Sequence, residues 1–328
     1  MAKVTVLTAV YNAEKYLRQC LDSLKVQTLA DCQFICIDDC STDNSVSIIR
    51  EYAASDSRFQ LLHTPTNSGQ AVARNLGLQF AKGEYIAMLD ADDWFVPDTL
   101  EQAYVRLKNT SAECAVLQLI QHYEDTGKEE LYQIKSTKTE WSGEEAFRLS
   151  LDWSLHGLYV VEASIHKRFP FDTSCRLYSD DNTTRLHYLN ASKVVMCKGK
   201  YYYRKHSASL TVSCSIHRFD HLLANLSMKR QLEALSITNK QETLNFYERH
   251  RWFNFLGLYS YYRQHKSSFT SDEQGKIEKT FADVLSTIEP RRLPLSLRLR
   301  PGYYPFRHYS VFSFVENAYL SLRKALPI

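Results

Sequence analysis

The sequence lacks any run of about eighteen consecutive apolar residues, the length that a membrane-spanning helix requires. Its N-terminal apolar run, Val4 to Val10, is too short for the hydrophobic region of a secretion signal, and no small-residue cleavage site follows it. The formal net charge of +3 is too small an excess to indicate a nucleic-acid partner. We therefore expect a cytoplasmic protein that does not bind nucleic acid.

Glycine is also scarce, with ten residues in a chain of 328 and no Gly-x-Gly sequence. Enzymes that bind NAD hold the pyrophosphate on a glycine-rich turn after the first strand, and that turn is missing here. The segment Tyr11-Asn12-Ala13-Glu14 also differs from the Gly- and Arg-rich loop of a sugar nucleotidyltransferase. The sequence therefore argues against both enzyme classes.

Cysteines are present but do not form a recognisable metal motif. Cys32, Cys36 and Cys40 follow one another at four-residue spacing, which on a helix could form a metal cluster. The continuous β-forming run Gln33-Phe34-Ile35-Cys36-Ile37 instead predicts a strand buried on both faces, so that the thiols cannot converge on one ion. We expect reduced cysteines in the core.

Short apolar strands alternate with amphipathic helices over the first hundred residues. This alternation is typical of a mostly parallel sheet covered by helices, and ligands of such sheets bind outside the carboxyl ends of the strands. The expected strands are 4–8, 34–37, 59–62 and 84–89, and the expected helices are 14–25, one that opens after the capping cluster Ser41-Thr42-Asp43, and 69–81.

The rest of the chain divides into two parts. Residues 111–212 mix strands at 115–120 and 193–197 with a helix that begins near Gly143, and we expect them to complete the sheet. Residues 213–328 form a helical C-terminal region. Its tail, 291–328, carries seven Lys or Arg and one acid, and these charges are interleaved with Leu, Phe and Tyr. Contact with an anionic membrane, self-association and ordinary helix packing are all open interpretations of this tail.

The sharpest local feature is Asp90-Ala91-Asp92, which follows an apolar strand directly. Two carboxylates on a tight turn can hold Mg²⁺ or Mn²⁺ while phosphate oxygens of a substrate complete the coordination shell. Capping of the next helix is the simpler alternative, because Asp is common in turns.

Three other segments accompany this acidic turn in a fixed order: Tyr11-Asn12, Asp38-Asp39-Cys40-Ser41-Thr42-Asp43 and Gly69 to Asn75. With them the sequence resembles the family 2 glycosyltransferases of the GT-A fold, closely over the N-terminal third and loosely over the middle third. The resemblance implies an α/β fold of the GT-A type, with a mostly parallel central sheet flanked by helices. Residues 1–212 would be the catalytic domain, in which 1–110 bind the nucleotide sugar and 111–212 bind the acceptor.

The resemblance also implies a set of donor-binding residues. Asp39 would accept a hydrogen bond from uracil N3–H, although N–H groups of guanine could also satisfy it. Arg74 would approach the donor sugar or its phosphates, where a guanidinium can bond two oxygens, and its alternative is a surface salt bridge. Asp92 would bind the metal directly. The full expected donor set is Ala9, Val10, Tyr11, Asp39, Arg74, Asp90 and Ala91.

Inverting members of this family use a carboxylate, usually the Asp of a Glu-Asp pair, to take the proton of the acceptor. The matching pair here is Asp180-Asp181, which precedes a predicted helix, and its first member is Asp instead of Glu. We assign Asp181 as the base and Asp180 as its supporting acid. The reverse assignment stays open because of this departure.

Two further groups of residues have weaker support. The segment Tyr201 to Ser209 resembles the one that closes the catalytic domain in this family, so Arg204 would contact the diphosphate and His206 the diphosphate or metal. An ordinary alternating strand would look similar. Trp153 and His156 lie where relatives contact the acceptor, with a core position for the Trp and a surface position for the His as alternatives.

The function that the resemblance implies is transfer of a sugar, with inversion, from a UDP-sugar to an acceptor hydroxyl in polysaccharide or glycoconjugate biosynthesis. The cofactor would be Mn²⁺ or Mg²⁺. The acceptor would be a saccharide, a lipid-linked saccharide or a glycoprotein. The tail would allow peripheral contact with the inner face of the membrane or formation of a homo-oligomer. A noncatalytic scaffold that binds a partner glycosyltransferase is the alternative.

Overall fold

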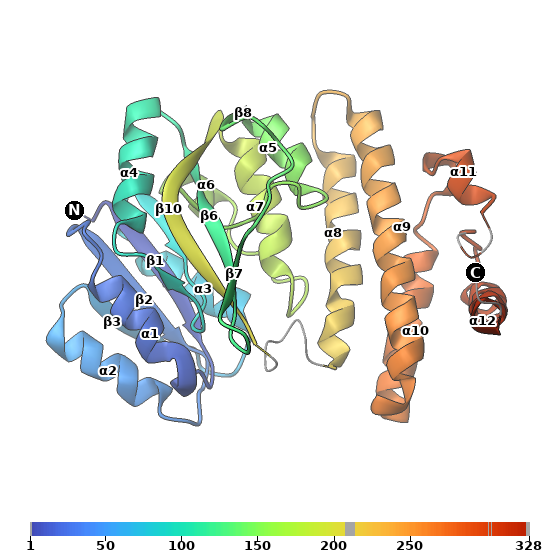
Figure 1. The fold of residues 1–328 in the computed structure, drawn as a ribbon, viewed down its shortest axis with the longest axis horizontal. Coiled ribbons are helices and arrows are strands. Elements are labelled where there is room, and N and C mark those ends of the chain that lie inside the picture. Colours follow the sequence, from blue (N-terminus) through green and yellow to red (C-terminus); the bar gives the residue numbers. More distant parts are fainter. Residues whose placement is uncertain (1, 207–213, 301, 303, 326–328) are drawn as a thin grey trace. The chain divides into compact units, whose positions relative to one another are not determined.

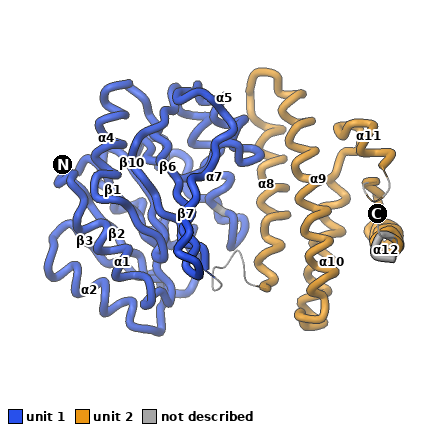
Figure 2. Tube along the Cα trace, viewed as in Figure 1, with its two compact units in different colours: residues 1–209 blue, residues 210–328 orange. Residues whose placement is uncertain are grey.

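The computed structural model describes residues 2–206, 214–300, 302 and 304–325 (Figure 1). The chain forms two compact units, residues 1–209 and 210–328 (Figure 2). The first contains the sheet and the second is helical, and each is described here by itself.

The first four long strands form the parallel half of the sheet, in the order β3-β2-β1-β4. Side chains of successive strand residues enter opposite layers, because they alternate between the two faces of a strand. Val6 and Phe34 pack in the layer that includes α1 and α4, whereas Leu7 and Ile35 pack in the layer that includes α3. The bounds are β1 (Val4–Val10), α1 (Glu14–Lys25), β2 (Cys32–Asp38), α2 (Ser45–Ser55), β3 (Phe59–His63), α3 (Gln70–Phe80), β4 (Tyr85–Met88) and α4 (Thr99–Thr110).

The second half of the sheet mixes directions. Strand β9 runs antiparallel to both β4 and β6, β6 runs parallel to β10, and β5 lies antiparallel on β10. Strand β7 pairs with β6 and β8 with β10. The bounds are β5 (Trp94–Phe95), β6 (Cys114–Tyr123), β7 (Lys128–Leu131), β8 (Glu140–Ser142), α5 (Gly143–Ser150), β9 (Tyr159–Glu162), α6 (Ala163–Arg168), α7 (Ser179–Asn190) and β10 (Lys193–Lys205).

Strand β10 is much longer than the expected strand 193–197. Its pairing with β6 shifts register between Met196 and Lys200, so the strand continues past an irregularity that interrupts the sequence pattern. Gly199 lies within this irregularity, where a Cβ would come within 2.6 Å of the Thr99 carbonyl oxygen. The predicted strand and the separate Tyr201 segment are therefore one strand as far as Lys205, and residues 207–209 of that segment lie outside the described residues.

The capping cluster 41–43 serves the helices on both sides of it. Asn44, the N-cap of α2, makes no side-chain cap, but Asp43 Oδ1 accepts from the amide of Ser45, the first residue of α2, at 3.0 Å. Ser41 Oγ also accepts from the Asn12 amide, and Asp43 Oδ2 accepts from the Glu14 amide, both at 3.0 Å. Ala13, the N-cap of α1, has no hydroxyl or carboxylate of its own, so the second loop supplies the missing acceptors for the amides at this helix start. These bonds fix the loop that carries Tyr11.

The helical unit packs around aromatic side chains. The predicted aromatic stretch lies on the long helix α9, where Trp252, Phe255 and Tyr259 are buried against Phe281 of α10 and Phe312 of α12. None of the helices in the described part of the chain is long and apolar enough to cross a membrane. The bounds are η1 (Ile216–Phe219), α8 (Asp220–Ala234), α9 (Lys240–His265), η2 (Lys266–Ser268), α10 (Ser271–Leu285), η3 (Pro290–Arg292), α11 (Leu295–Arg298) and α12 (Tyr309–Ala325).

Gly143 at the start of α5 leads to a stability prediction. A Cβ there would lie 2.0 Å from the Ala191 carbonyl oxygen and 2.5 Å from that of Tyr188, at the end of α7. Both obstacles are backbone atoms, so Gly143→Ala should lower the free energy of unfolding by about 3 kcal/mol. Gly275→Ala on α10 is the control, since no atom lies within 4 Å of its Cβ. It should instead stabilise the chain by about 0.5–1 kcal/mol in urea unfolding, and equal effects would contradict the packing at Gly143.

Candidate active site

The four motifs of the N-terminal third meet at one edge of the sheet. Val10 at the end of β1 pairs with Asp38 at the end of β2, and Leu7 pairs with Met88 at the end of β4. The Asp39 amide donates to the Val10 carbonyl oxygen at 2.8 Å, which keeps the two chain segments together beyond the strands. The carboxyl edge expected for the ligand thus carries the expected motifs.

Asp39 is buried and already oriented by its neighbours. Its carboxylate accepts from Thr64 Oγ1 at 2.6 Å and from the amides of Ser68 and Gly69 at 2.9 and 2.7 Å. Gly69 has φ +88°, a conformation that favours glycine, so this amide can turn toward the acid. A carboxylate offers about four lone-pair sites, so one remains for a further donor.

The residues beside Asp39 divide between core and surface. The Tyr11 side chain is 52% exposed and available for stacking, whereas Val10 has no exposed area and packs in the core. Ala9 is half-buried, and Ala91 is buried in the same core cluster as Val10. A contact between Val10 and a base would therefore have to come from its backbone.

Arg74 is buried and forms an ion pair with Asp90, whose side chain is 35% exposed, so the guanidinium does not belong to a surface salt bridge. Its Nε and Nη1 are buried without a hydrogen-bond partner among the described residues. Burial raises the pKa of Asp90 to about 6, with Asp92 and Asp180 adding to the rise and Arg74 opposing it. Buried donors of Arg74 beside crowded carboxylates suit the binding of an anion together with a cation.

Asp93 is a third acid that the sequence analysis did not single out. It is buried, and its carboxylate accepts from Tyr201 Oη at 2.6 Å and from the Arg204 amide at 2.7 Å. Tyr201 Oη also accepts from the Asp90 amide at 3.2 Å. Burial raises the pKa of Asp93 well above its usual range. Asp93 therefore connects the acidic turn to β10. In the sequence it is marked only as a third Asp, directly after Asp92, that has no role in the motif.

Arg204 and His206 both contact the acidic turn. The Arg204 guanidinium lies 4.7 Å from the ring centre of Tyr16 and 4.6 Å from that of Trp94, and Nε donates to the Asp92 carbonyl oxygen at 2.8 Å. Arg204 thus holds the turn in place. His206 Nε2 lies 3.0 Å from Asp92 Oδ2.

Asp92 and His206 fit a divalent cation as a pair. Their Nε2 and Oδ2 atoms form a direct hydrogen bond at 3.0 Å, and a carboxylate oxygen with an imidazole nitrogen beside it is a donor set that could hold such an ion. The described residues contain no group of three or more His, Cys, Asp or Glu that could hold a metal alone. None of the eight cysteines, all of which lie among the described residues, forms a disulfide, and six are buried. A bound cation would therefore depend on phosphate oxygens or water for the rest of its shell.

Asp180 and Asp181 lie in the first turn of α7. Asp180 contributes to the raised pKa of Asp90, and the segment that leads into α7 reaches the Gly69 turn, where a Cβ on Gly69 would lie 3.4 Å from the Arg176 side chain. Asp181 is 8% exposed, and burial raises its pKa to about 8, opposed by Arg185 and assisted by Asp180. A carboxyl group with such a pKa can take a proton near neutral pH.

Trp153 and His156 contact residues of α7. The Arg185 guanidinium lies 4.9 Å from the Trp153 ring centre, and Tyr188 Oη donates to the His156 carbonyl oxygen at 2.5 Å. His156 is buried, and burial lowers its pKa to about 4, so the ring is neutral at physiological pH. A surface position for His156 is therefore wrong, because the ring packs edge-on against Tyr132 in the interior.

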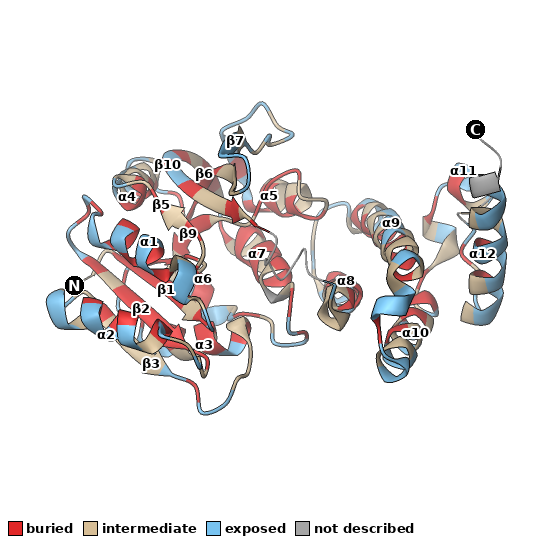
Figure 3. Cartoon of the chain, turned by 60° about the horizontal axis from the view of Figure 1, so that its bottom comes forward, coloured by how far each residue is buried: buried red, intermediate tan, exposed pale blue. Residues whose placement is uncertain are grey.

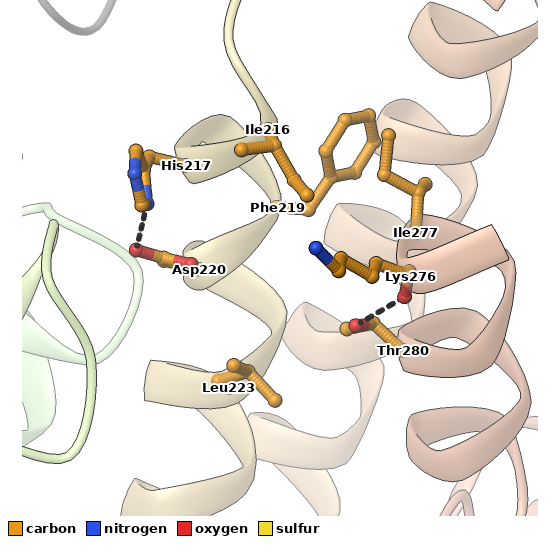
Figure 4. A pocket seen from close by; sticks show the side chains of 8 residues that line it. All are labelled: Ile216, His217, Phe219, Asp220, Leu223, Lys276, Ile277 and Thr280. Atoms are coloured by element: carbon orange, nitrogen blue, oxygen red, sulfur yellow. Dashed lines mark hydrogen bonds and ion pairs between the residues drawn. The ribbon is translucent and has the colours of Figure 1, made fainter. Parts of the chain in front are cut away.

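A separate pocket of about 140 Å³ lies in the helical unit, between η1, α8 and α10 (Figure 4). His217 and Asp220 form an ion pair at its rim, and Phe219 and Ile277 line it. None of the predicted site residues lines this pocket.

Similarities to known proteins identify the family of the chain. Residues 5–169 match the family Glycosyl transferase family 2. The chain is 33% identical over 217 residues to the putative glycosyltransferase EpsH of Bacillus subtilis, which covers 63% of this chain and 62% of EpsH. The chain thus spans less than two thirds of the length of that relative.

Two solved structures show the same fold. S. aureus TarS 1-349 in complex with UDP-GlcNAc superposes with a TM-score of 0.75 at 21% identity, over 97% of this chain and 92% of that one. The mannosyltransferase PcManGT of Pyrobaculum calidifontis, in complex with GDP-Man and Mn²⁺, gives 0.55 at 16% identity, over 97% and 87%. The expected fold class is confirmed.

Proposed function

Because the chain belongs to glycosyltransferase family 2, we propose that it transfers a sugar, with inversion, from a UDP-sugar to an acceptor hydroxyl. The observation that carries the proposal is that the predicted donor-site residues lie together at the carboxyl edge of the sheet. There Asp39 and the Asp92–His206 pair follow the strand ends, and the Arg74–Asp90 pair joins α3 to the acidic turn. Asp181, in the first turn of α7, would face them from the acceptor side.

Asp39 and Tyr11 would bind the uracil base. The free lone pair of Asp39 suits the N3–H of uracil, and the half-exposed Tyr11 ring offers a stacking surface. TarS, which carries UDP-GlcNAc, superposes with a higher TM-score than PcManGT, which carries GDP-Man, and this supports uridine over guanosine.

The donor diphosphate would lie between Arg74 and the Asp92–His206 pair. The unpartnered Nε and Nη1 of Arg74 could donate to phosphate or sugar oxygens. Mn²⁺ or Mg²⁺, held by Asp92 and His206, would neutralise the charge on the departing UDP. The Mn²⁺ of PcManGT supports a metal in a protein of this fold.

Asp181 would act as the base. The acceptor oxygen forms a bond to C1 of the donor sugar as the bond from C1 to the UDP oxygen breaks, and the acceptor proton passes to the Asp181 carboxylate. A single displacement of this kind inverts the configuration at C1. The acceptor we propose is a saccharide, free, lipid-linked or on a glycoprotein, in polysaccharide or glycoconjugate biosynthesis.

A pH profile of UDP release tests this role of Asp181. A base with a pKa of about 8 must lose its proton to work, so kcat/KM should rise about tenfold per pH unit from pH 6 and level off above pH 8. The rate is measured over a panel of UDP-sugars with Mn²⁺ and a saccharide acceptor. A profile already flat at pH 6 would remove Asp181 from the role, and no release from any donor would favour the noncatalytic scaffold.

A further inference from the structure

Helix α12 carries apolar side chains on two faces. One face is packed: Phe312 is buried against Trp252 and Tyr259, with ring centres 5.9 and 4.9 Å apart. The other face is open, because Val311, Phe314, Val315 and Leu322 are 44%, 76%, 36% and 62% exposed. Their spacing of three, four and eleven residues from Val311 places them along one side of the helix (Figure 3). Helix α12 thus packs on the helical unit with one face and exposes a second row of apolar side chains to solvent.

The segment before α12 extends this exposed area. Leu295 and Leu299 are 63% and 76% exposed, and Tyr304 is 49% exposed. Gly302 lies so close to the Tyr319 ring that a Cβ would be 2.2 Å from it, which brings this segment against α12. Seven of the fifteen exposed large apolar side chains of the described chain lie between residues 295 and 322, so their concentration here is not ordinary surface scatter. We call these seven side chains the C-terminal apolar surface: Leu295, Leu299, Tyr304, Val311, Phe314, Val315 and Leu322.

Positive charge surrounds the C-terminal apolar surface. Arg291, Arg300 and Arg307 are exposed. The only acid between residues 291 and 328 is Glu316, which is buried on the packed side of α12. Burial raises the pKa of Glu316 to about 7 although Arg263 opposes the rise. The described part of this segment therefore exposes arginine and apolar side chains to solvent, whereas its one carboxylate is buried.

We propose that the C-terminal apolar surface binds the face of an anionic lipid bilayer, with α12 lying along the interface. Apolar side chains such as Phe314 enter the acyl boundary while the arginines meet lipid phosphates. A second copy of the chain fits less well, because a two-fold contact would place the same exposed arginines near one another. This proposal does not depend on the proposed function.

Sedimentation of the full chain with vesicles tests the proposal. The vesicles contain phosphatidylcholine alone or phosphatidylcholine with about one quarter phosphatidylglycerol. We expect sedimentation with the anionic vesicles at low salt, at least about tenfold weaker binding without phosphatidylglycerol, and release at high salt. No sedimentation with anionic vesicles, or equal binding to both compositions, would overturn it.

Variants separate the two components of binding. Phe314→Ser with Leu322→Ser removes two exposed apolar side chains, and Arg291→Gln with Arg300→Gln and Arg307→Gln removes three cations. Each set should weaken binding to anionic vesicles at least about tenfold, while UDP binding in solution stays at the wild-type level. The control is Phe80→Ser, a 44% exposed apolar residue of α3, which should bind like wild type. A similar loss in the control, or light scattering that shows a dimer broken by Phe314→Ser and Leu322→Ser without vesicle binding, would overturn the proposal.

Discussion

Asp181→Asn should lower kcat by about 10²- to 10⁴-fold, because the amide cannot take the acceptor proton. Binding of the UDP-sugar should stay within about twofold of wild type, since the substitution keeps the shape of a residue assigned to the acceptor side. The measurement is steady-state UDP release together with calorimetric titration of the donor. Retention of full turnover by Asp181→Asn would reject the assignment.

Asp181→Asn should also raise the free energy of unfolding. A loss of turnover in this variant could then not be attributed to unfolding. Burial raises the pKa of Asp181 from 3.8 to about 8. Between these two pKa values Asp181 is ionised in the unfolded chain but protonated in the folded chain. The free energy of unfolding therefore falls as pH rises from about 4 to about 8. Asn carries no charge, so thermal unfolding at pH 7.5 should show a gain of about 1–3 kcal/mol.

Asp180→Asn is the matched comparison for the base. It lies next to Asp181 in the first turn of α7 and is less buried. If Asp181 is the base, Asp180→Asn should reduce kcat by less than about tenfold and keep the pH dependence. A larger loss in Asp180→Asn than in Asp181→Asn would support the reverse assignment.

Asp92→Asn should lower kcat/KM by about 10²- to 10³-fold and should weaken activation by Mn²⁺. Of the pair at this site, Asp92 supplies the charged oxygen and His206 the nitrogen. An amide oxygen carries no charge to offset the cation, so the metal concentration for half-maximal activity should rise at least about tenfold.

A surface acid provides the control for Asp92. Asp125→Asn changes an exposed residue between β6 and β7 and should leave rate and Mn²⁺ dependence unchanged. Circular dichroism of both variants should match wild type, because Asp93, Tyr201 and Arg204 hold the turn by bonds that Asp92→Asn does not remove. Unchanged Mn²⁺ activation of Asp92→Asn would exclude Asp92 as a ligand.

Elements fixed by local pattern were predictable from the sequence. Helix α1 has the expected bounds, Glu14–Lys25, because Leu17, Leu21 and Leu24 recur at helical spacing. The first four strands also lie where expected, since continuous apolar runs mark strands buried on both faces. The course of β10 was missed, because the irregularity near Gly199 interrupts its alternation.

Interactions between distant segments could not be read from the sequence. Asp93 and Tyr201 are 108 residues apart, and Arg204 donates to Gln19 across 185 residues. The Asp43 carboxylate accepts from the first amide of the next helix, as the local pattern predicted, but also from the Glu14 amide 29 residues before it, which the pattern did not predict. Motifs located the site, whereas the side chains that hold it rigid depend on topology.

Calorimetric titration of UDP into the full chain, in Mn²⁺ and again in EDTA with GDP as comparison, tests the central claim most directly. We expect UDP to bind in Mn²⁺, at least about tenfold more weakly in EDTA, and more tightly than GDP, because Asp92 and His206 need the cation and Asp39 suits uracil. Equal UDP binding in EDTA would contradict the metal site. Binding of neither nucleotide would contradict the proposed transferase activity and favour the noncatalytic scaffold.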